Sequence, residues 1–557
     1  MKTDIEISQS ADIKRIVDIA NILKLKEDDL ELFGKYKAKI ALNVIDEKKI
    51  KRNKLVLVTA ITPTPAGEGK TTMSIGLTQG LNKLGKKATV VLREPSLGPV
   101  FGIKGGAAGG GNSQVIPMED INLHFTGDLS AVEKANNLLS ALIDNNIQNN
   151  KTHNLNIDPR TIMWKRVTDM NDRSLRSIVS GLGGVKHGVP REAGFNITAA
   201  SEVMAILCLS ENLKDLKTRL GNIFVGYTYD NKPIFARDLN AHGAMTALMK
   251  DAIRPNLVQT LEGNPAIIHG GPFANIAQGT NSIIATKVGL SLSDFVITEA
   301  GFATDLGAEK FFNIKCQSGG LMPRATVVVA TIRALKYHGG IQLKNLKIPN
   351  VEALKKGLEN LDKHIENMQF FGFDPIVAIN KFTSDSKEEI DAVIQHCNEL
   401  GAKSSVVDAW EKGGEGAIEL AELVVEAAKT CPSCFNTLYK PEFELEEKID
   451  LIAKKIYGAE HVEYTVSAKN QLDQIKSLGL GNLAVCMSKT QKSLSGDPHK
   501  RGRPRDFTLK IREIELASGA GFIIPMTGNI MRMPGLPQRP AAENIDIDNE
   551  GVIKGLF

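Results

Sequence analysis

Residues 55–71 read LVLVTAITPTPAGEGKT, and this stretch decides the fold. Its first half, Leu55–Thr62, is apolar and rich in β-branched residues, which is typical of a strand buried on both faces of a parallel sheet. A glycine-rich turn follows, and a helix is expected over residues 71–84. This order of elements predicts a phosphate-binding site, because backbone N–H groups in the turn and at the helix start point toward an anion.

We call residues 64–71 the phosphate loop. Its members are predicted to bind a nucleotide: Thr64, Pro65, Ala66, Gly67, Glu68, Gly69, Lys70 and Thr71. Lys70 is expected to reach the β- and γ-phosphates, and the Thr71 hydroxyl to bind Mg²⁺. The loop departs from the pattern GxxxxGK[ST] at its first position, where Thr64 replaces glycine. The alternative is a strand-to-helix turn that holds no ligand.

Similar apolar runs recur along the chain, with helical stretches between many of them. They include residues 88–92, 266–269, 295–298, 325–332, 375–379, 405–407, 483–487 and 521–525. Alternation of apolar strands with helices predicts an α/β protein with a mostly parallel, doubly wound sheet. Together with the phosphate loop, it predicts a P-loop NTPase-like sheet accompanied by two smaller α/β domains.

The composition excludes several classes of protein. The 557 residues include 68 Lys and Arg against 64 Asp and Glu, and this weak excess indicates neither nucleic acid nor a membrane surface as a partner. No apolar run approaches the roughly 18–20 residues of a transmembrane helix, and the N-terminus lacks the apolar segment of a secretory signal. Six cysteines make no disulfide framework. The pair Cys431 and Cys434 is interpreted as ordinary thiols, and we expect a reduced, cytoplasmic protein.

A second charged position and a dense run of glycines follow the next strand. Arg93 comes directly after residues 88–92, and six glycines fall between Gly102 and Gly111. Loops at the carboxyl ends of neighbouring parallel strands meet at one crevice, so Arg93 is expected to face the phosphate loop. Glycines at this density serve where backbone approaches a ligand or another backbone closely.

Long and unusual strings of residues identify a family. They include REPSLGPVFG (93–102), GIKGGAAGGG (102–111), EAGFATDLGAEKF (299–311), VATIRALKYHGG (329–340) and MPGLPQRPAAENID (533–546). Together they resemble formate–tetrahydrofolate ligase in its monofunctional form, over nearly the whole chain. The resemblance implies an ATP-dependent ligation of formate to tetrahydrofolate through formyl phosphate, which gives 10-formyltetrahydrofolate, ADP and phosphate.

The resemblance also implies roles for single residues. Arg93 would hold formate and then formyl phosphate, since a guanidinium binds a carboxylate or phosphate through two parallel hydrogen bonds. Phe302 and Trp410 would enclose the flat folate ring. Lys70 and Arg93 are thus the expected catalytic residues. The family further implies Mg²⁺ with ATP, a monovalent cation and a homotetramer, with ATP, formate and a polyglutamylated or plain tetrahydrofolate as partners.

Three domains are expected on this basis. Residues 1–360 would form the nucleotide-binding domain, with residues 130–235 as a helical insertion. Residues 361–445 would form an α/β domain on the folate side, and residues 446–557 a C-terminal α/β domain. The charged segment Lys440–Glu447, with Pro441 near its start, is the expected linker between the last two.

The chain departs from the family at a few positions. Asn112, Gln278 and Asn196 stand where the family usually has Tyr, His and Asp, and Thr280 stands where Cys is common. Each change removes an aromatic ring, a titratable group or a charge. Activity is still expected, because Lys70, Arg93 and the glycine run are kept. Two alternatives remain: a P-loop ATPase switch that acts through protein partners, and a catalytically weakened relative that only binds folate or nucleotide.

Some polar residues have weaker assignments. His124, His269 and Asp128 are candidates for supporting or proton-handling groups, although a lone histidine is more often structural. The basic loop His499–Arg505 could meet the acidic tail of a polyglutamylated folate. A solvated loop or a subunit contact is the favoured interpretation of that loop.

Overall fold

A computed structural model describes residues 2–102, 108–149, 154–430, 435–528 and 530–556. Its centre is a large sheet in which seven neighbouring strands run parallel. In spatial order these are β14 (Pro265–Ile268), β4 (Ala88–Leu92), β15 (Phe295–Glu299), β3 (Lys54–Ala60), β16 (Pro323–Ala330), β17 (Ile376–Asn380) and β18 (Ser404–Val407). The expectation of a mixed α/β protein with a mostly parallel sheet is confirmed.

Antiparallel strands extend the sheet beyond β14. The strand β13 (Asn256–Thr260) pairs with β14, and it also pairs with β2 (Ala38–Ile40) and β6 (Ser113–Ile116). The short strands β1 (Leu30–Leu32) and β5 (Gly109–Gly110) complete this edge by pairing with β2 and β6. The glycine run therefore ends in a strand beside the central sheet.

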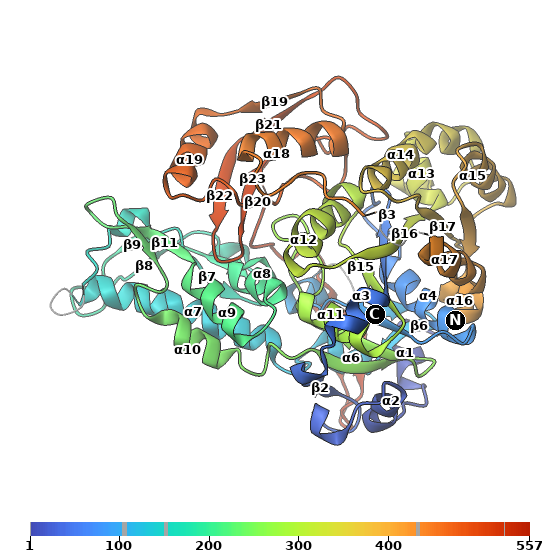
Figure 1. The fold of residues 1–557 in the computed structure, drawn as a ribbon, viewed down its shortest axis with the longest axis horizontal. Coiled ribbons are helices and arrows are strands. Elements are labelled where there is room, and N and C mark those ends of the chain that lie inside the picture. Colours follow the sequence, from blue (N-terminus) through green and yellow to red (C-terminus); the bar gives the residue numbers. More distant parts are fainter. Residues whose placement is uncertain (1, 103–107, 150–153, 431–434, 529, 557) are drawn as a thin grey trace.

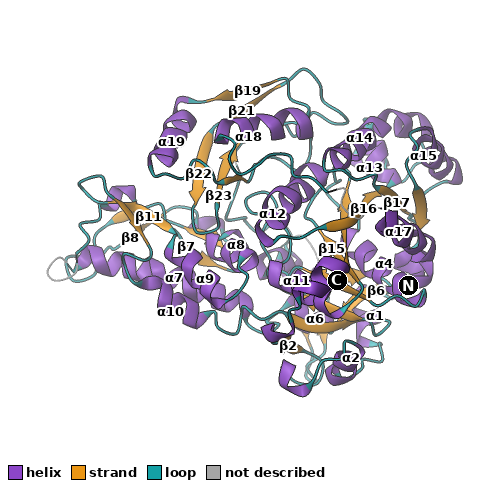
Figure 2. Ribbon diagram, in the orientation of Figure 1, coloured by secondary structure: helices purple, strands orange, loops and turns teal. Residues whose placement is uncertain are grey.

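Strand β3 shows why the sheet is buried on both faces. Val56, Val58 and Ala60 belong to one apolar cluster, whereas Leu55 and Leu57 belong to another. Because successive side chains of a strand point to opposite faces, β3 packs against helices on both sides. One face is covered by α4 (Lys70–Lys83) and α17 (Ile418–Thr430), and the other by α11 (Ile283–Leu292), α13 (Ile332–His338) and α14 (Val351–Phe370). Figure 2 shows these helices around the strands.

The described residues between 128 and 253 lie to one side of this sheet, in cyan and green in Figure 1. They contain α7 (Asp128–Gln148), α8 (Glu202–Leu209), α9 (Leu213–Gly221) and α10 (Ala241–Leu248). Three small sheets accompany them: β7 (Arg166–Thr168) with β10 (Phe195–Ile197), β8 (Ile178–Ser180) with β9 (Arg191–Ala193), and β11 (Phe224–Tyr227) with β12 (Pro233–Phe235). The segment expected to be a helical insertion therefore contains strands as well as helices.

The C-terminal elements, orange to red in Figure 1, build further small sheets. One pairs β19 (His461–Tyr464) with β21 (Thr508–Ile511), and another orders β20 (Ala484–Val485), β23 (Phe522–Met526) and β22 (Glu513–Ala517). The helices α18 (Leu445–Leu451) and α19 (Val466–Ser477) lie beside them. Among the helices that the model describes, none is long and apolar enough to cross a membrane.

The segment from 361 to 445 differs from the expected arrangement. A boundary at residue 361 falls inside α14, and β17 and β18 hydrogen-bond into the same sheet as β3 and β16. The helix α15 (Lys387–Glu399) joins β17 to β18 as an ordinary crossover helix, and α17 follows β18. This part of the chain thus extends the central sheet instead of building a sheet of its own.

Candidate active site

Polar residues gather where the parallel strands end. Arg93 directly follows β4, Glu299 is the last residue of β15, and Asn380 is the last residue of β17. Thr331 directly follows β16, and the phosphate loop follows β3. Because the carboxyl ends of parallel strands lie along one edge, these five segments share one side of the sheet, as in ligand sites of open α/β sheets.

The phosphate loop has the backbone shape that its glycines allow. Gly67 and Gly69 have φ angles of 80° and 74°, in the left-handed region that favours glycine. Gly69 caps α4, which begins at Lys70. A Cβ atom at Gly69 would come within 2.5 Å of Asn380 Nδ2, so a side chain there would also collide with the end of β17.

Thr64, the departure from the glycine pattern, has a clear structural partner. Its backbone N–H donates to Glu68 Oε1 at 2.6 Å, and its hydroxyl donates to the same oxygen at 2.9 Å. The second oxygen of Glu68 accepts from the Thr331 hydroxyl. Burial raises the pKa of Glu68, with these hydrogen bonds acting in the opposite direction. The Glu68 side chain is therefore directed into the protein, where it closes the loop on itself.

Side chains from β17 and α13 contact the outside of the loop. Asn380 Nδ2 donates to the carbonyl of Glu68 at 3.1 Å, and Arg333 Nη2 donates to the carbonyl of Gly67 at 3.0 Å. The Arg333 guanidinium also lies 3.9 Å from the centre of the Phe382 ring. These contacts hold two carbonyl groups away from the inside of the loop, which leaves the inside to N–H donors.

Arg93, Glu299 and Thr71 form a chain of charged and polar contacts. Arg93 Nη2 lies 3.7 Å from Glu299 Oε1, and the Thr71 hydroxyl donates to Glu299 Oε2 at 2.8 Å. Arg93 Nη1 donates to the Pro272 carbonyl at 3.4 Å, whereas its Nε is buried without a partner. Arg93 is 24% exposed and Glu299 only 3%. The guanidinium therefore has hydrogen-bonding capacity left for an anion.

Sequence reasoning missed Glu299. The available signal was a carboxylate that ends the otherwise apolar strand Phe295–Glu299. Together with the Thr71 hydroxyl it offers oxygen ligands, which Mg²⁺ prefers, and Mg²⁺ needs only one or two carboxylates beside phosphate oxygens. The two residues thus fit the predicted metal. The described residues contain no cluster of three or more His, Cys, Asp or Glu that could hold an ion by itself.

A second missed carboxylate adjoins Arg93. Glu94 is buried, and its Oε2 has no hydrogen-bond partner. Burial, reinforced by the nearby charge of Asp128, raises its pKa well above the usual range. Its backbone N–H donates to the carbonyl of Gly270 at 2.9 Å, which joins the ends of β4 and β14. Burial thus favours the protonated form of Glu94, which directly follows the predicted formate-binding residue in the chain.

Asp128 and His269 have internal partners. Asp128 pairs with buried Lys39 at 2.7 Å and accepts from Asn256 Nδ2 at 2.8 Å. His269 contacts the Ser282 hydroxyl and the Ala252 carbonyl, each at 2.6 Å, and burial lowers its pKa to about 4. Both contact patterns are those of residues that hold the fold together.

The two predicted folate-binding rings are not in contact. Phe302 has a φ of 60°, unusual for a residue with a side chain. Trp410 lies in α16 (Ala409–Lys412), after β18. Three strands separate β15 from β18, a spacing of roughly 19 Å between these strands. The described ring contacts include no pair of Phe302 with Trp410.

Trp410 instead packs on the end of the glycine run. The Asn112 backbone N–H donates to the Trp410 carbonyl at 2.8 Å, and Asn112 Nδ2 donates to the carbonyl of Glu411 at 2.5 Å. A Cβ atom at Gly111 would come within 2.0 Å of the Trp410 carbonyl oxygen. The glycine thus allows the close backbone approach that its position predicted. Residues 103–107 of the run, like Cys431 and Cys434, lie outside the described residues.

The other departures from the family pattern lie elsewhere. Gln278 is fully buried, and neither polar atom of its amide has a partner. Asn196 lines a cavity of about 660 Å³ between α8 and the strands β22 and β23. That cavity contains none of Lys70, Arg93, Phe302 or Trp410. The predicted site is therefore an edge of the central sheet, separate from this cavity.

The basic loop His499–Arg505 faces carboxylates of the protein itself. Arg503 pairs with Glu366 at 2.5 Å, and Arg505 lies 3.6 Å from Glu359. Arg501 stacks 4.0 Å from the centre of the Tyr337 ring. These contacts within the protein explain the three arginines, and no polyglutamate tail is needed to explain them.

A family model described as formate–tetrahydrofolate ligase matches residues 2–557. The match spans essentially the whole chain, including every segment that forms the edge described above.

Proposed function

Since the chain belongs to the formate–tetrahydrofolate ligase family, we propose that it catalyses ATP-dependent ligation of formate to tetrahydrofolate through formyl phosphate. The products are 10-formyltetrahydrofolate, ADP and phosphate. The observation that carries this proposal is the contact chain from Arg93 through Glu299 to Thr71, at the mouth of the phosphate loop. This contact chain supports the proposal, because it brings the Arg93 guanidinium next to a residue predicted to hold the nucleotide.

The first step joins two anions, formate and the γ-phosphate, so the site must neutralise charge before they approach. The phosphate loop offers N–H donors, and the start of α4 adds a partial positive charge. Arg93 binds formate through two parallel hydrogen bonds and aims one carboxylate oxygen at phosphorus. Its partly satisfied donors suit it to this task.

Thr71 and Glu299 are the residues that would hold Mg²⁺. When bound, the ion supplies charge neutralisation at the phosphate oxygens. Glu299 has a second effect, because its charge orients Arg93 from behind. Formate attack displaces ADP and leaves a formyl group on phosphate, which Arg93 continues to bind.

Formyl phosphate is a reactive anhydride, so it must meet N10 of the folate before water does. Phe302 follows β15 by three residues and Trp410 follows β18 by three, so the two rings stand on either side of the phosphate loop in strand order. We assign the folate to the space above that loop, near Arg93 and the buried carboxyl group of Glu94. N10 attacks the formyl carbon and phosphate leaves.

Release of ADP by the purified protein tests the proposal. We expect ADP only when formate and tetrahydrofolate are both present, with 10-formyltetrahydrofolate formed in equal amount. ADP release that needs a protein partner would support an ATPase switch instead. Binding of nucleotide and folate without turnover would identify a weakened relative.

The assembly and the nucleotide form are part of the same proposal. We expect Mg²⁺–ATP as the nucleotide, stimulation by a monovalent cation and a homotetramer. Light scattering measures the assembly, and turnover in Na⁺, K⁺ and NH₄⁺ salts measures the cation effect. A monomer with full activity would contradict the tetramer.

A further inference from the structure

Two buried histidines hold the residue that leads into the phosphate loop. Thr62 lies between β3 and the loop, and its backbone N–H donates to His364 Nε2 at 2.8 Å. Its carbonyl accepts from His338 Nε2 at 2.9 Å. The rings come from α14 and α13, which cover the same face of the sheet. Both backbone polar groups of Thr62 are therefore bound by side chains.

These contacts determine the proton positions on both rings. His364 Nε2 accepts the Thr62 N–H, so Nδ1 carries the proton and donates to the Thr304 hydroxyl at 2.5 Å. His338 Nε2 donates, so its Nδ1 accepts from the Gly502 N–H at 3.2 Å. Burial lowers the pKa of His364 to about 3 and that of His338 to about 4. Both rings are neutral at physiological pH, and each has one donor and one acceptor in use.

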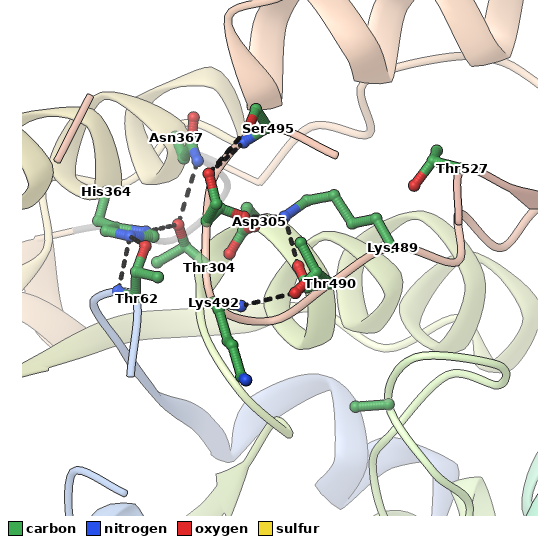
Figure 3. Close-up of polar contacts among 12 residues, drawn as sticks. Thr62, Thr304, Asp305, His364, Asn367, Lys489, Thr490, Lys492, Ser495 and Thr527 are labelled. Atoms are coloured by element: carbon green, nitrogen blue, oxygen red, sulfur yellow. Dashed lines mark hydrogen bonds and ion pairs between the residues drawn. The ribbon is translucent and has the colours of Figure 1, made fainter. Parts of the chain in front are cut away.

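His364 thus connects two loops of the predicted site. Thr62 precedes the phosphate loop by two residues, and Thr304 follows Phe302 by two residues. Figure 3 shows the ring of His364 next to Thr62 and Thr304, with Asn367 Nδ2 donating to the same Thr304 hydroxyl at 3.1 Å. The loop assigned to ATP and the loop assigned to folate are therefore fastened to the two nitrogens of one rigid ring.

The attachment points are themselves anchored. Asn360 Nδ2 donates both to the Thr62 hydroxyl, at 3.0 Å, and to the Gly502 carbonyl, at 2.8 Å. Next to Thr304, Asp305 pairs with Lys489 of the C-terminal elements at 2.7 Å, and both side chains are buried (Figure 3). Each loop thus has partners besides His364, and the His364 ring joins the two loops to each other.

We propose that His364 is a positioning residue of the ligase reaction, which holds the phosphate loop and the Phe302 segment at a fixed separation. This inference rests on the function proposed above. His364 contacts no substrate in this proposal, and it acts through Thr62 and Thr304.

Three variants separate the two ends of the ring. His364→Phe keeps the ring volume and removes the hydrogen bonds of the ring to Thr62 and to Thr304. Thr304→Val keeps the shape of the threonine and removes the hydroxyl that accepts both from His364 Nδ1 and from Asn367 Nδ2. His364→Gln offers an amide oxygen to the Thr62 N–H. Val393→Ala is the control, because Val393 is a buried apolar residue of α15, which packs on α14 without sharing these hydrogen bonds.

Steady-state kinetics, with each substrate varied in turn, gives the kcat and KM values that test the role of His364. We expect His364→Phe to lower kcat/KM at least tenfold for both ATP and tetrahydrofolate. Thr304→Val should raise KM for tetrahydrofolate several-fold with little change in KM for ATP. His364→Gln should restore most of the kcat/KM for ATP that His364→Phe loses. The double variant His364→Phe/Thr304→Val should lose less than the sum of the two single losses, since both changes break the same contact between His364 Nδ1 and the Thr304 hydroxyl.

Thermal melting of each variant separates positioning from a loss of stability. Val393→Ala should lower Tm by at least as much as His364→Phe and keep near-normal kinetics. Equal kinetic losses in both variants, or unchanged kinetics in His364→Phe, would overturn the proposal. If the wild-type protein forms no formyltetrahydrofolate, the proposed function has failed. Calorimetric titration with ATP then decides the positioning role by itself: a tenfold weaker affinity in His364→Phe supports it, and unchanged affinity removes it.

Discussion

The Arg93 guanidinium lies 3.7 Å from the carboxylate of Glu299, too far for a hydrogen bond and close enough for charge attraction. The other carboxylate oxygen of Glu299 accepts a hydrogen bond from the Thr71 hydroxyl at 2.8 Å. The carboxylate therefore orients the arginine without saturating its donors. In the proposed reaction, an incoming anion would therefore meet a cation that is already oriented and still has N–H groups to donate.

Replacing Glu299 by glutamine tests the carboxylate. The amide oxygen can still accept from Thr71, but the negative charge is lost. We expect the Mg²⁺ concentration that gives half-maximal activity to rise about tenfold or more, since one charged ligand of the proposed metal is gone. Titrating activity with MgCl₂ measures this. Glu415→Gln on the surface is the control, and an unchanged Mg²⁺ requirement in Glu299→Gln would show that Glu299 has no part in metal binding.

Arg93→Ala is expected to abolish ligation and leave ATP affinity within a few-fold of wild type. Arg93→Lys keeps the charge but not the two-pronged geometry, so we expect a loss of roughly 100-fold or more in kcat/KM for formate. An assay of formyltetrahydrofolate formation measures the loss of ligation, and calorimetric titration measures the affinity for ATP. Arg505→Lys, at an exposed arginine, is the matched control. Near-normal synthesis by Arg93→Ala would mean that another group binds formate.

Gly111→Ala tests the contact between the glycine run and Trp410. The new Cβ would lie 2.0 Å from the Trp410 carbonyl, at a φ of 56°. We expect a lower Tm and a several-fold higher KM for tetrahydrofolate. Gly85→Ala is the matched control, because Gly85 has a φ of 72° and open space around its Cβ position. It should cost only the backbone strain, about 1 kcal/mol, and leave the kinetics unchanged. Similar kinetics in both variants would remove Trp410 from the folate site.

Glu309 predicts a pH-dependent stability. It is fully buried, and burial raises its pKa from 4.5 to about 7. Between these values the folded protein binds a proton that the unfolded chain releases. The contribution of Glu309 to the free energy of unfolding is therefore full below about pH 4.5. It falls by about 1.4 kcal/mol per pH unit above that value and is lost as the pH rises through 7.

Glu309→Gln removes this titration. The difference in unfolding free energy, variant minus wild type, should rise with pH between 5 and 7 and level off above 7. Denaturant melts at several pH values measure it. A difference that stays constant across this range would place the pKa of Glu309 near its ordinary value.

The central fold follows from local sequence features. The run Leu55–Thr62 and the turn after it are contiguous, so their periodicity and glycine content suffice to predict β3, the phosphate loop and α4. The position of Arg93 follows in the same way, because a residue that directly follows a parallel strand must lie at the carboxyl edge.

The remaining features depend on contacts between distant segments. The joining of β17 and β18 to the central sheet depends on strand pairing across the chain, and no local pattern specifies a pairing partner. The sequence predicts that Glu68 binds the nucleotide, because it lies in the loop. Its side chain instead satisfies Thr64 and Thr331, and the position of Thr331 is known only from the fold. The separation of Phe302 from Trp410 likewise follows from the strand order.

Phe302 has a consequence for how this protein evolves. A left-handed backbone at a residue with a side chain costs roughly 1–3 kcal/mol, and glycine would relieve it. Selection for thermal stability alone would therefore replace Phe302 by glycine. A phenylalanine that persists there in thermophilic descendants of this chain would indicate that the ring is kept for catalysis, in opposition to stability.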